Sequence, residues 1–174
     1  MAPDESGAMK KLPDDVRAEE GRALARLGDG GWHPEIQAGL RAGRFSDELV
    51  GATADLVRAW AIPADWIAAV PARRGEGGDL VSDFAARLAA ALERPFAPVL
   101  ERADERPPQR EMANSAQQVA NVRGAFRVAG EVPTGACLLV DDVRFSGWTL
   151  AMTAGQLRRR GASAVFPLAL ATAF

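Results

Sequence analysis

The sequence CLLVDDVRFSGWT, residues 137–149, places an apolar run, two acids and a glycine turn in direct succession. Its first four residues have the length and composition of a buried strand, and Asp141 and Asp142 follow them directly. A short loop containing Gly147 comes next, and an apolar periodicity typical of a helix begins after Thr149. The stretch therefore predicts a strand, a turn and a helix, with two carboxylates close to the helix N-terminus.

Short apolar runs alternate with helical periods along the chain from residue 66 onward. The expected strands are 66–70, 96–100, 124–128, 137–140 and 164–170. Helices are expected from the capping residue Asp79 to Leu92 and from about Trp148 to Arg160. Because the strands are continuously apolar rather than alternating, the pattern predicts an α/β fold with a parallel sheet flanked by helices.

The first third of the chain is expected to be helical. Residues 1–13 hold two prolines, a glycine and mixed charge, which favours a disordered tail. The expected helices are 14–27, 35–42 and 46–60. We therefore divide the rest of the chain into a helical segment, 14–62, that packs on the core, and an α/β domain, 63–174.

The bulk properties bound the class of protein. The 174 residues are 48% hydrophobic and 25% charged, as expected for one globular domain. A net charge of −2 argues against a general electrostatic grip on nucleic acid. The single Cys137 excludes an internal disulfide framework and indicates a reducing compartment, so a cytoplasmic location is expected. No apolar run approaches the ~20 residues that span a bilayer, and no membrane association is expected.

Polar side chains follow two of the expected strands. Asp141 and Asp142 come after one strand, and Arg73 and Arg74 lie in the loop after 66–70. Ligands of open parallel sheets bind at the carboxyl ends of the strands, so the acids and the arginines could face one crevice.

The loop chemistry suits a ligand that carries hydroxyls and a phosphate. The first turn of a helix leaves unpaired N–H groups, and Gly147 permits the close backbone approach that a phosphate needs. The hydroxyls of Ser146 and Thr149 could add donors. Asp141 and Asp142 could accept hydrogen bonds from the vicinal hydroxyls of a ribose, or contact the shell of a Mg²⁺ ion.

Residues 137–149 resemble the phosphoribosyl-pyrophosphate (PRPP) loop of the type I phosphoribosyltransferases, which reads apolar strand, two acids, Thr or Ser, Gly, any residue, Thr. QQVANVRGAF, residues 117–126, is similar to the segment before that loop in the competence protein ComF subfamily. A wider set of segments, over roughly residues 16–172, resembles the phosphoribosyltransferase-like C-terminal tail of actinobacterial RecQ-type DNA helicases. These segments are EGRALARLGDGGW, SDELV, VPARR, NSAQQVANVRGAF and VDDVRFSGWTL. The ATP-binding pattern G-x-x-x-x-G-K-[ST] does not occur in the sequence.

The resemblance implies a type I phosphoribosyltransferase fold and a role for each matching residue. Asp141 and Asp142 would be catalytic, binding the ribose hydroxyls, and would contact Mg²⁺ through substrate or water. Arg73 and Arg74 would form the pyrophosphate loop, and residues 101–114 would be a hood that closes over the substrate. The PRPP and 5′-phosphate site would consist of Val143, Arg144, Phe145, Ser146, Gly147, Trp148 and Thr149. The reaction would displace pyrophosphate from C1 of the ribose by a nitrogenous base.

Phe145 departs from the family pattern and leaves a second hypothesis open. Several purine-type members carry an acid at this position, where it handles the proton of the base, and Phe145 could only stack or pack. Arg144 and Trp148 are also bulkier than the residues usual there. The alternative is a non-catalytic binding or regulatory module of DNA repair, recombination or DNA uptake, with a helicase or DNA as its partner. Both hypotheses are compatible with a homodimer.

Plain structural roles compete with these functional ones. The 141–149 stretch could be a solvated strand end followed by an ordinary helix start, and Arg73 and Arg74 could be solvated. For His33 a capping or packing role is expected. The arginines 158–160 are typical of a solvated helix end, with nucleic-acid contact as the less favoured interpretation. Surface positions are likewise expected for Gln117, Gln118 and Asn121.

Overall fold

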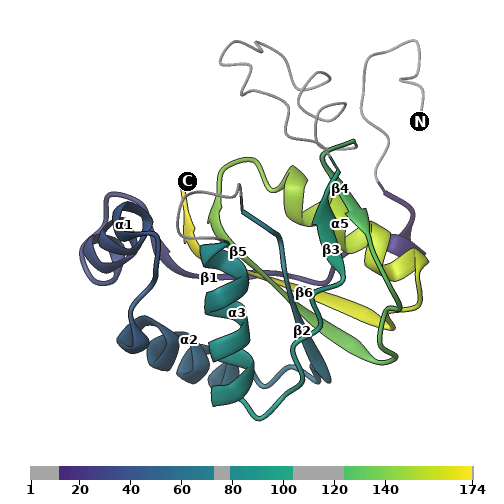
Figure 1. The fold of residues 1–174 in the computed structure, drawn as a ribbon, viewed down its shortest axis with the longest axis horizontal. Helices are drawn as coiled ribbons and strands as arrows, with labels where there is room; N and C mark the ends of the chain where they lie inside the picture. The colour runs from purple at the N-terminus through teal and green to yellow at the C-terminus, as the bar shows by residue number, and fades with distance from the viewer. Residues whose placement is uncertain (1–11, 73–78, 104–123, 174) are drawn as a thin grey trace.

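A computed structural model describes residues 12–72, 79–103 and 124–173. Its strands are β1 (Arg22–Arg26), β2 (Trp66–Ala69), β3 (Leu100–Arg102), β4 (Phe126–Val128), β5 (Ala136–Arg144) and β6 (Ala164–Thr172). Its helices are α1 (His33–Ala42), α2 (Asp47–Trp60), α3 (Leu80–Ala91) and α5 (Trp148–Arg159), with a 3-10 turn η1 (Asp14–Val16). Four strands form a parallel sheet in the order β1-β6-β5-β2, and β3 and β4 form a separate antiparallel hairpin (Figure 1). The expected α/β architecture, a parallel sheet flanked by helices, is confirmed.

The sheet separates two apolar layers. Leu138 and Val140 of β5 face the layer built with α1, α2 and α3, whereas Cys137 and Leu139 face α5 and the β3–β4 hairpin. Successive side chains of a strand point to opposite faces, so a strand covered on both sides must be apolar at every position. This explains why the strand runs of the sequence show no polar alternation.

The strand β2 ends where β5 continues, so the acids have no paired strand on the β2 side. The amide of Val70 donates to the carbonyl of Val140 at 2.8 Å, but Pro71 has no N–H to continue the ladder. The expected end of the β5 strand at residue 140 is wrong, because β5 stays paired with β6 as far as Arg144. Asp141 and the residues after it therefore lie on a strand edge that β2 has left.

The expected helix over 14–27 is wrong. Only η1 forms there, and β1 then pairs with β6, with the amide of Leu27 donating to the carbonyl of Thr172 at 2.8 Å. Helix propensity is a weak local preference, and the open edge of β6 offers a full ladder of hydrogen bonds in its place. The 14–62 segment is thus not wholly helical, because β1 belongs to the main sheet. Of the expected tail, residues 1–11 lie outside the described residues.

A proline inside β6 is accommodated by a glycine beside it. Prolines are rare inside strands that pair on both sides, since they cannot donate to the ladder. Gly21 lies against Pro167, where a Cβ atom would come within 2.9 Å of the Pro167 carbonyl oxygen. The amide of Glu19 donates to the carbonyl of Val165 at 2.8 Å, and regular pairing starts again at Arg22 with Leu168. The segment beside β6 can therefore lie close to Pro167 because Gly21 has no side chain.

The other expected elements form near their expected bounds, with one shift. The strand expected at 96–100 starts later, as β3, while Phe96 makes an isolated parallel bridge to Ile67 at the edge of the sheet. The helix α2 is capped as expected, with the Ser46 hydroxyl accepting a hydrogen bond from the Leu49 amide at 3.2 Å. No helix among the described residues is long and apolar enough to cross a membrane.

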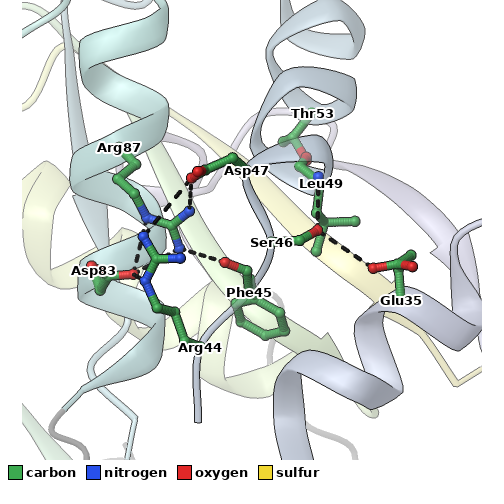
Figure 2. Close-up of polar contacts among 9 residues, drawn as sticks. All are labelled: Glu35, Arg44, Phe45, Ser46, Asp47, Leu49, Thr53, Asp83 and Arg87. Atoms are coloured by element: carbon green, nitrogen blue, oxygen red, sulfur yellow. Dashed lines mark hydrogen bonds and ion pairs between the residues drawn. The ribbon is translucent and has the colours of Figure 1, made fainter. Parts of the chain in front are cut away.

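An arginine of α3 fixes the start of α2. Arg87 donates to the carboxylate of Asp47 at 2.8 Å, to the carbonyl of Phe45 at 2.7 Å and to the carboxylate of Asp83 at 2.7 Å (Figure 2). Its side chain is only 20% exposed, so these bonds are partly shielded from water. This contact braces α2 against α3 on the face of the sheet away from α5.

Candidate functional site

The two acids of the central stretch lie within β5, at its carboxyl end. Asp141 and Asp142 are half-buried as whole residues. The Asp141 carboxylate accepts a hydrogen bond from the Asp142 amide at 2.9 Å, and the Asp142 carboxylate accepts one from the Val143 amide at 2.6 Å. Each carboxylate therefore uses an oxygen to hold the backbone of the next residue, which fixes the acids relative to the strand.

The carboxyl group of Asp141 is largely removed from water, and this burial disfavours its charged form. Burial, followed by the negative charge of Asp142, raises the pKa of Asp141 to about 8, although the hydrogen bond from the Asp142 amide and the charge of Arg102 act in the opposite direction. A buried acid beside another acid attracts protons or cations. The acid pair is thus suited to a ligand that brings positive charge or hydrogen-bond donors.

The loop after β5 leads into a helix without a side-chain cap. Gly147 stands at the N-cap of α5 with φ +76°, a left-handed conformation that glycine adopts without strain. No side chain accepts a capping hydrogen bond at this N-cap, and no acid lies in the first turn of α5. The Ser146 hydroxyl lies 3.5 Å from the Trp148 amide, a long contact. The first-turn N–H groups, together with the hydroxyl of Thr149, form the part of the loop that suits an anion.

Two large side chains flank this turn. The guanidinium of Arg144 lies against Gly147, since a Cβ atom on that glycine would come within 3.0 Å of its Nε atom. Phe145 is 63% exposed, and among the described residues it is the one large hydrophobic residue with an exposed side chain. The predicted phosphate-binding residues thus run from the end of β5 through a short turn into α5, with the Arg144 guanidinium against Gly147 and the Phe145 ring exposed.

The loop between β2 and α3 is closed at its base by the cap of α3. The carboxylate of Asp79 accepts hydrogen bonds from the amides of Ala72, Val81 and Ser82 at 3.1, 3.1 and 3.2 Å. Because β2 pairs with β5 in parallel, the base of this loop and the acid pair both lie at the carboxyl ends of the strands. Arg73 and Arg74 lie outside the described residues, so their pyrophosphate role stays a prediction.

Arg102 is a site residue that sequence reasoning missed. We expected residues 101–114 to form a loop, but Arg102 belongs to β3 and pairs with Phe126 of β4. Its guanidinium lies 4.8 Å from the centre of the Phe126 ring, and its Nε atom donates to the Pro71 carbonyl at 3.0 Å. The pairing joins residues far apart in sequence, and no local pattern indicates it. Residues 104–114 of the expected hood, and Gln117, Gln118 and Asn121, lie outside the described residues.

Two other predicted positions have structural partners. Arg158 donates to the Asp15 carbonyl at 2.9 and 3.1 Å and also to the carbonyl of Ser163, which fixes the start of the described chain against α5. His33 accepts a hydrogen bond at Nδ1 from the Gly28 amide at 3.2 Å, so it fixes the preceding loop to the start of α1, whose N-cap residue is Trp32. Among the described residues, no group of three or more His, Cys, Asp or Glu side chains could hold a metal ion by itself.

Neither a protein-family model nor a curated protein matches the chain. Among solved structures, an adenine phosphoribosyltransferase aligns with a TM-score of 0.49 and 17% identity, covering 73% of this chain and 71% of that one. The Saccharomyces cerevisiae adenine phosphoribosyltransferase, solved with an imino-altritol bisphosphate and adenine, gives 0.49 and 18%, covering 73% and 70%. A Pyrococcus horikoshii purine phosphoribosyltransferase gives 0.46 and 20%, covering 85% and 77%. Identities and scores this low carry no conclusion about chemistry, and the resemblances to ComF and to helicase tails stay predictions.

Proposed function

We propose that this chain is a phosphoribosyltransferase-like protein that binds the ribose 5-phosphate group of PRPP, together with Mg²⁺, at the carboxyl end of β5. One observation carries the proposal. Two half-buried acids are followed, within a single short loop, by a helix that starts at a left-handed glycine and has no side-chain cap. This arrangement coincides with the stretch that resembles a PRPP loop. It offers acceptors for the hydroxyls of a sugar next to donors for a phosphate.

The phosphate would bind at the start of α5. Its oxygens would accept hydrogen bonds from the backbone amides of the first turn, and the hydroxyls of Ser146 and Thr149 would add donors. Gly147 would let the backbone approach the phosphate closely, and a left-handed residue beside a helical one can direct successive amides toward an anion. The Arg144 guanidinium lies near enough to Gly147 to add positive charge beside the same turn.

The acid pair would hold the sugar and contribute to holding the ion. Mg²⁺ binds proteins through one or two carboxylates while keeping water and substrate oxygens in its shell, so a donor set of Asp141 and Asp142 fits it. A divalent ion, when bound, would neutralise charge on the diphosphate of PRPP as that group leaves. The two carboxylates would also accept hydrogen bonds from the ribose hydroxyls and so orient C1 of the sugar.

The proposal extends to transfer of the phosphoribosyl group from PRPP to a nitrogenous base. In that reaction the bond from C1 to the pyrophosphate oxygen breaks and a bond from C1 to a base nitrogen forms. Arg73 and Arg74 would bind the departing pyrophosphate, in keeping with the family resemblance. Phe145 has no group that could accept or donate a proton, so proton transfer to or from the base would have to come from elsewhere.

Calorimetric titration with PRPP and Mg²⁺ tests the binding proposal. The wild type is expected to bind, and the double substitution Asp141→Asn with Asp142→Asn is expected to weaken binding by at least about tenfold, since it removes both negative charges. Asp55→Asn is the matched control, because Asp55 is an exposed acid that pairs with Arg58 on α2, away from the site. A wild type that shows no heat of binding would contradict the proposal. Release of pyrophosphate with a panel of purine and pyrimidine bases then tests transfer.

Phe145 favours one second candidate, a module that binds single-stranded DNA. An exposed aromatic ring beside an arginine is a surface on which a nucleic acid base can stack. The test is fluorescence anisotropy with a labelled oligonucleotide at two salt concentrations, for wild type and for Phe145→Ala. Salt-dependent binding that Phe145→Ala weakens supports this candidate, and an anisotropy that stays flat at low salt contradicts it.

A further inference from the structure

Arg102 links the β3–β4 hairpin to the base of the loop after β2, close to the acid pair of β5. Its guanidinium lies over the Phe126 ring, across the β3–β4 hairpin. Its Nε atom donates to the carbonyl of Pro71, the residue that ends β2 and begins the loop up to Asp79. Its positive charge also acts on the Asp141 carboxyl group at the end of β5. Arg102 therefore lies where the hairpin, the base of the 71–79 loop and the acid pair meet.

The hairpin has an apolar contact and a polar contact of its own. Leu100 and Phe126 are buried in the layer that includes Leu139 of β5. Gln156 of α5 donates to the carbonyl of Phe126 at 3.1 Å. These contacts hold the hairpin against α5 and the sheet face, and the same apolar layer includes Val70 at the end of β2. Among the hydrogen bonds of the described residues, the one from Arg102 to Pro71 joins the hairpin to that strand end.

We propose that Arg102 is a positioning residue of the ribose-phosphate site, which holds the β3–β4 hairpin against the ends of β2 and β5 and thereby fixes the acid pair relative to the base of the 71–79 loop. The inference rests on the proposed function for what the site binds, but the contacts themselves do not depend on it. An arginine suits this position because its planar guanidinium can stack on a ring and donate in its own plane at the same time.

A pair of substitutions at Arg102 separates charge from shape. Arg102→Met keeps the apolar stem but removes the positive charge and the hydrogen bond to Pro71. Arg102→Lys restores a charge that can lie over Phe126, but not the planar fork. Arg127→Met is the matched control on the same hairpin, because Arg127 is 67% exposed and pairs with the exposed Glu101.

Hydrogen exchange of the ligand-free protein gives the first measurement. In Arg102→Met, the amides of the hairpin and of Ala72 at the loop base are expected to exchange about tenfold faster, on the scale of a lost charged hydrogen bond and cation–π contact. Arg127→Met is expected to stay within about twofold of wild type, as exposed ion pairs contribute little. Amides of α2 and α3 should exchange alike in all variants. Equal acceleration throughout the molecule, or none at the hairpin, overturns the inference.

Affinity for PRPP with Mg²⁺ gives a second measurement, which a merely structural role would not change selectively. Arg102→Met is expected to bind about tenfold more weakly, Arg102→Lys to recover part of that loss, and Arg127→Met to bind like wild type. A lysine variant no better than the methionine variant in both measurements contradicts the role of the charge. A wild type that binds no PRPP would defeat the proposed function, while the exchange rates would still decide whether Arg102 positions the hairpin.

Discussion

The helices α3 and α5 both begin at the carboxyl edge of the sheet, but their first turns are built differently. The N-terminus of α3 is capped by Asp79, whose carboxylate accepts three backbone amides and the Ser82 hydroxyl. The N-terminus of α5 begins at Gly147, with no side-chain cap and no acid in its first turn. The Asp79 side chain satisfies first-turn amides of α3, whereas the first turn of α5 has no such side-chain cap, which is the arrangement that an anion site needs.

The acids near the two helices differ in the same way. Asp79 has donors around it and holds the ends of a loop together. Asp141 is largely buried and has a second acid as its neighbour. Strained or poorly compensated charge tends to mark functional sites, because stability alone would favour pairing it. The comparison teaches that the chain itself caps α3 but not α5, as expected if α3 serves stability and α5 binds the proposed phosphate, and four substitutions or conditions test it.

The largest loss of PRPP affinity is expected from Gly147→Ala. An alanine there would adopt an unfavourable left-handed conformation and meet the Arg144 guanidinium at about 3.0 Å. PRPP affinity should fall by about 100-fold, the equivalent of about 2.7 kcal/mol, on the scale of charge-assisted hydrogen bonds. Calorimetry measures this loss directly.

Gly43→Ala is the matched control for this substitution. Gly43 ends α1 at φ +73°, and a Cβ atom added there would meet nothing within 4 Å, so it shares the backbone strain but not the site. Its stability should fall in a chemical denaturation experiment while its PRPP affinity stays unchanged. Equal affinity loss in both variants would show that backbone strain, and not the phosphate site, controls binding.

Asp79→Ala should have the next largest effect, and it should act on stability. Loss of the cap leaves the first-turn amides of α3 without their acceptor, which costs about 2 kcal/mol in the free energy of unfolding. Urea denaturation measures this cost, and Asp79→Asn, which keeps an acceptor, should lose less. A stability equal to wild type would mean that α3 does not depend on its cap and would remove the contrast with α5.

Ser146→Asp should make α5 resemble α3. An acid just before the helix interacts favourably with the helix dipole, so the unfolding midpoint should not fall. The same acid would repel a phosphate, and PRPP affinity should drop by about tenfold. Ser146→Asn is the neutral control and should bind more tightly than the aspartate variant. Unchanged affinity in Ser146→Asp would place the phosphate away from this turn.

The last prediction concerns how the stability of the ligand-free protein depends on pH. Because the pKa of Asp141 is raised in the folded chain to about 8, the folded state holds a proton that the unfolded state has released above its ordinary value near 3.8. The contribution of Asp141 to stability should therefore be fully present below about pH 4 and be lost as pH rises toward 8. Urea midpoints measured across this window should fall less in Asp141→Asn than in wild type. Parallel profiles for the two proteins would contradict the burial of this carboxyl group.

Most of the fold could be predicted from local patterns in the sequence. The helices α2 and α3 and the succession of β5, turn and α5 follow from caps, periodicity and glycine placement, all of which act within a few residues. The predicted acid pair and phosphate turn do lie together at one end of the sheet, because they are adjacent in the chain.

Features that depend on distant partners could not be predicted in the same way. The segment RALAR of β1 has the residues of a helix and becomes a strand only because β6 lies beside it. The sequence predicts that the strand ends before Asp141 and Asp142. Pairing with β6 instead continues β5 through both acids to Arg144. Arg102 gains its role from pairing with Phe126 across a hairpin whose connection is long.

The position of β6 within the sheet also has a consequence for biosynthesis. This strand lies between β1 and β5, yet it follows both of them in the chain and is the last strand of the described residues. As the chain leaves the ribosome, β1 has no neighbour in the sheet until β6 has emerged, and the order of synthesis therefore opposes the order of pairing. Until then residues 22–26 have no neighbour that favours a strand over a helix, so β1 is expected to be among the last parts of the sheet to form.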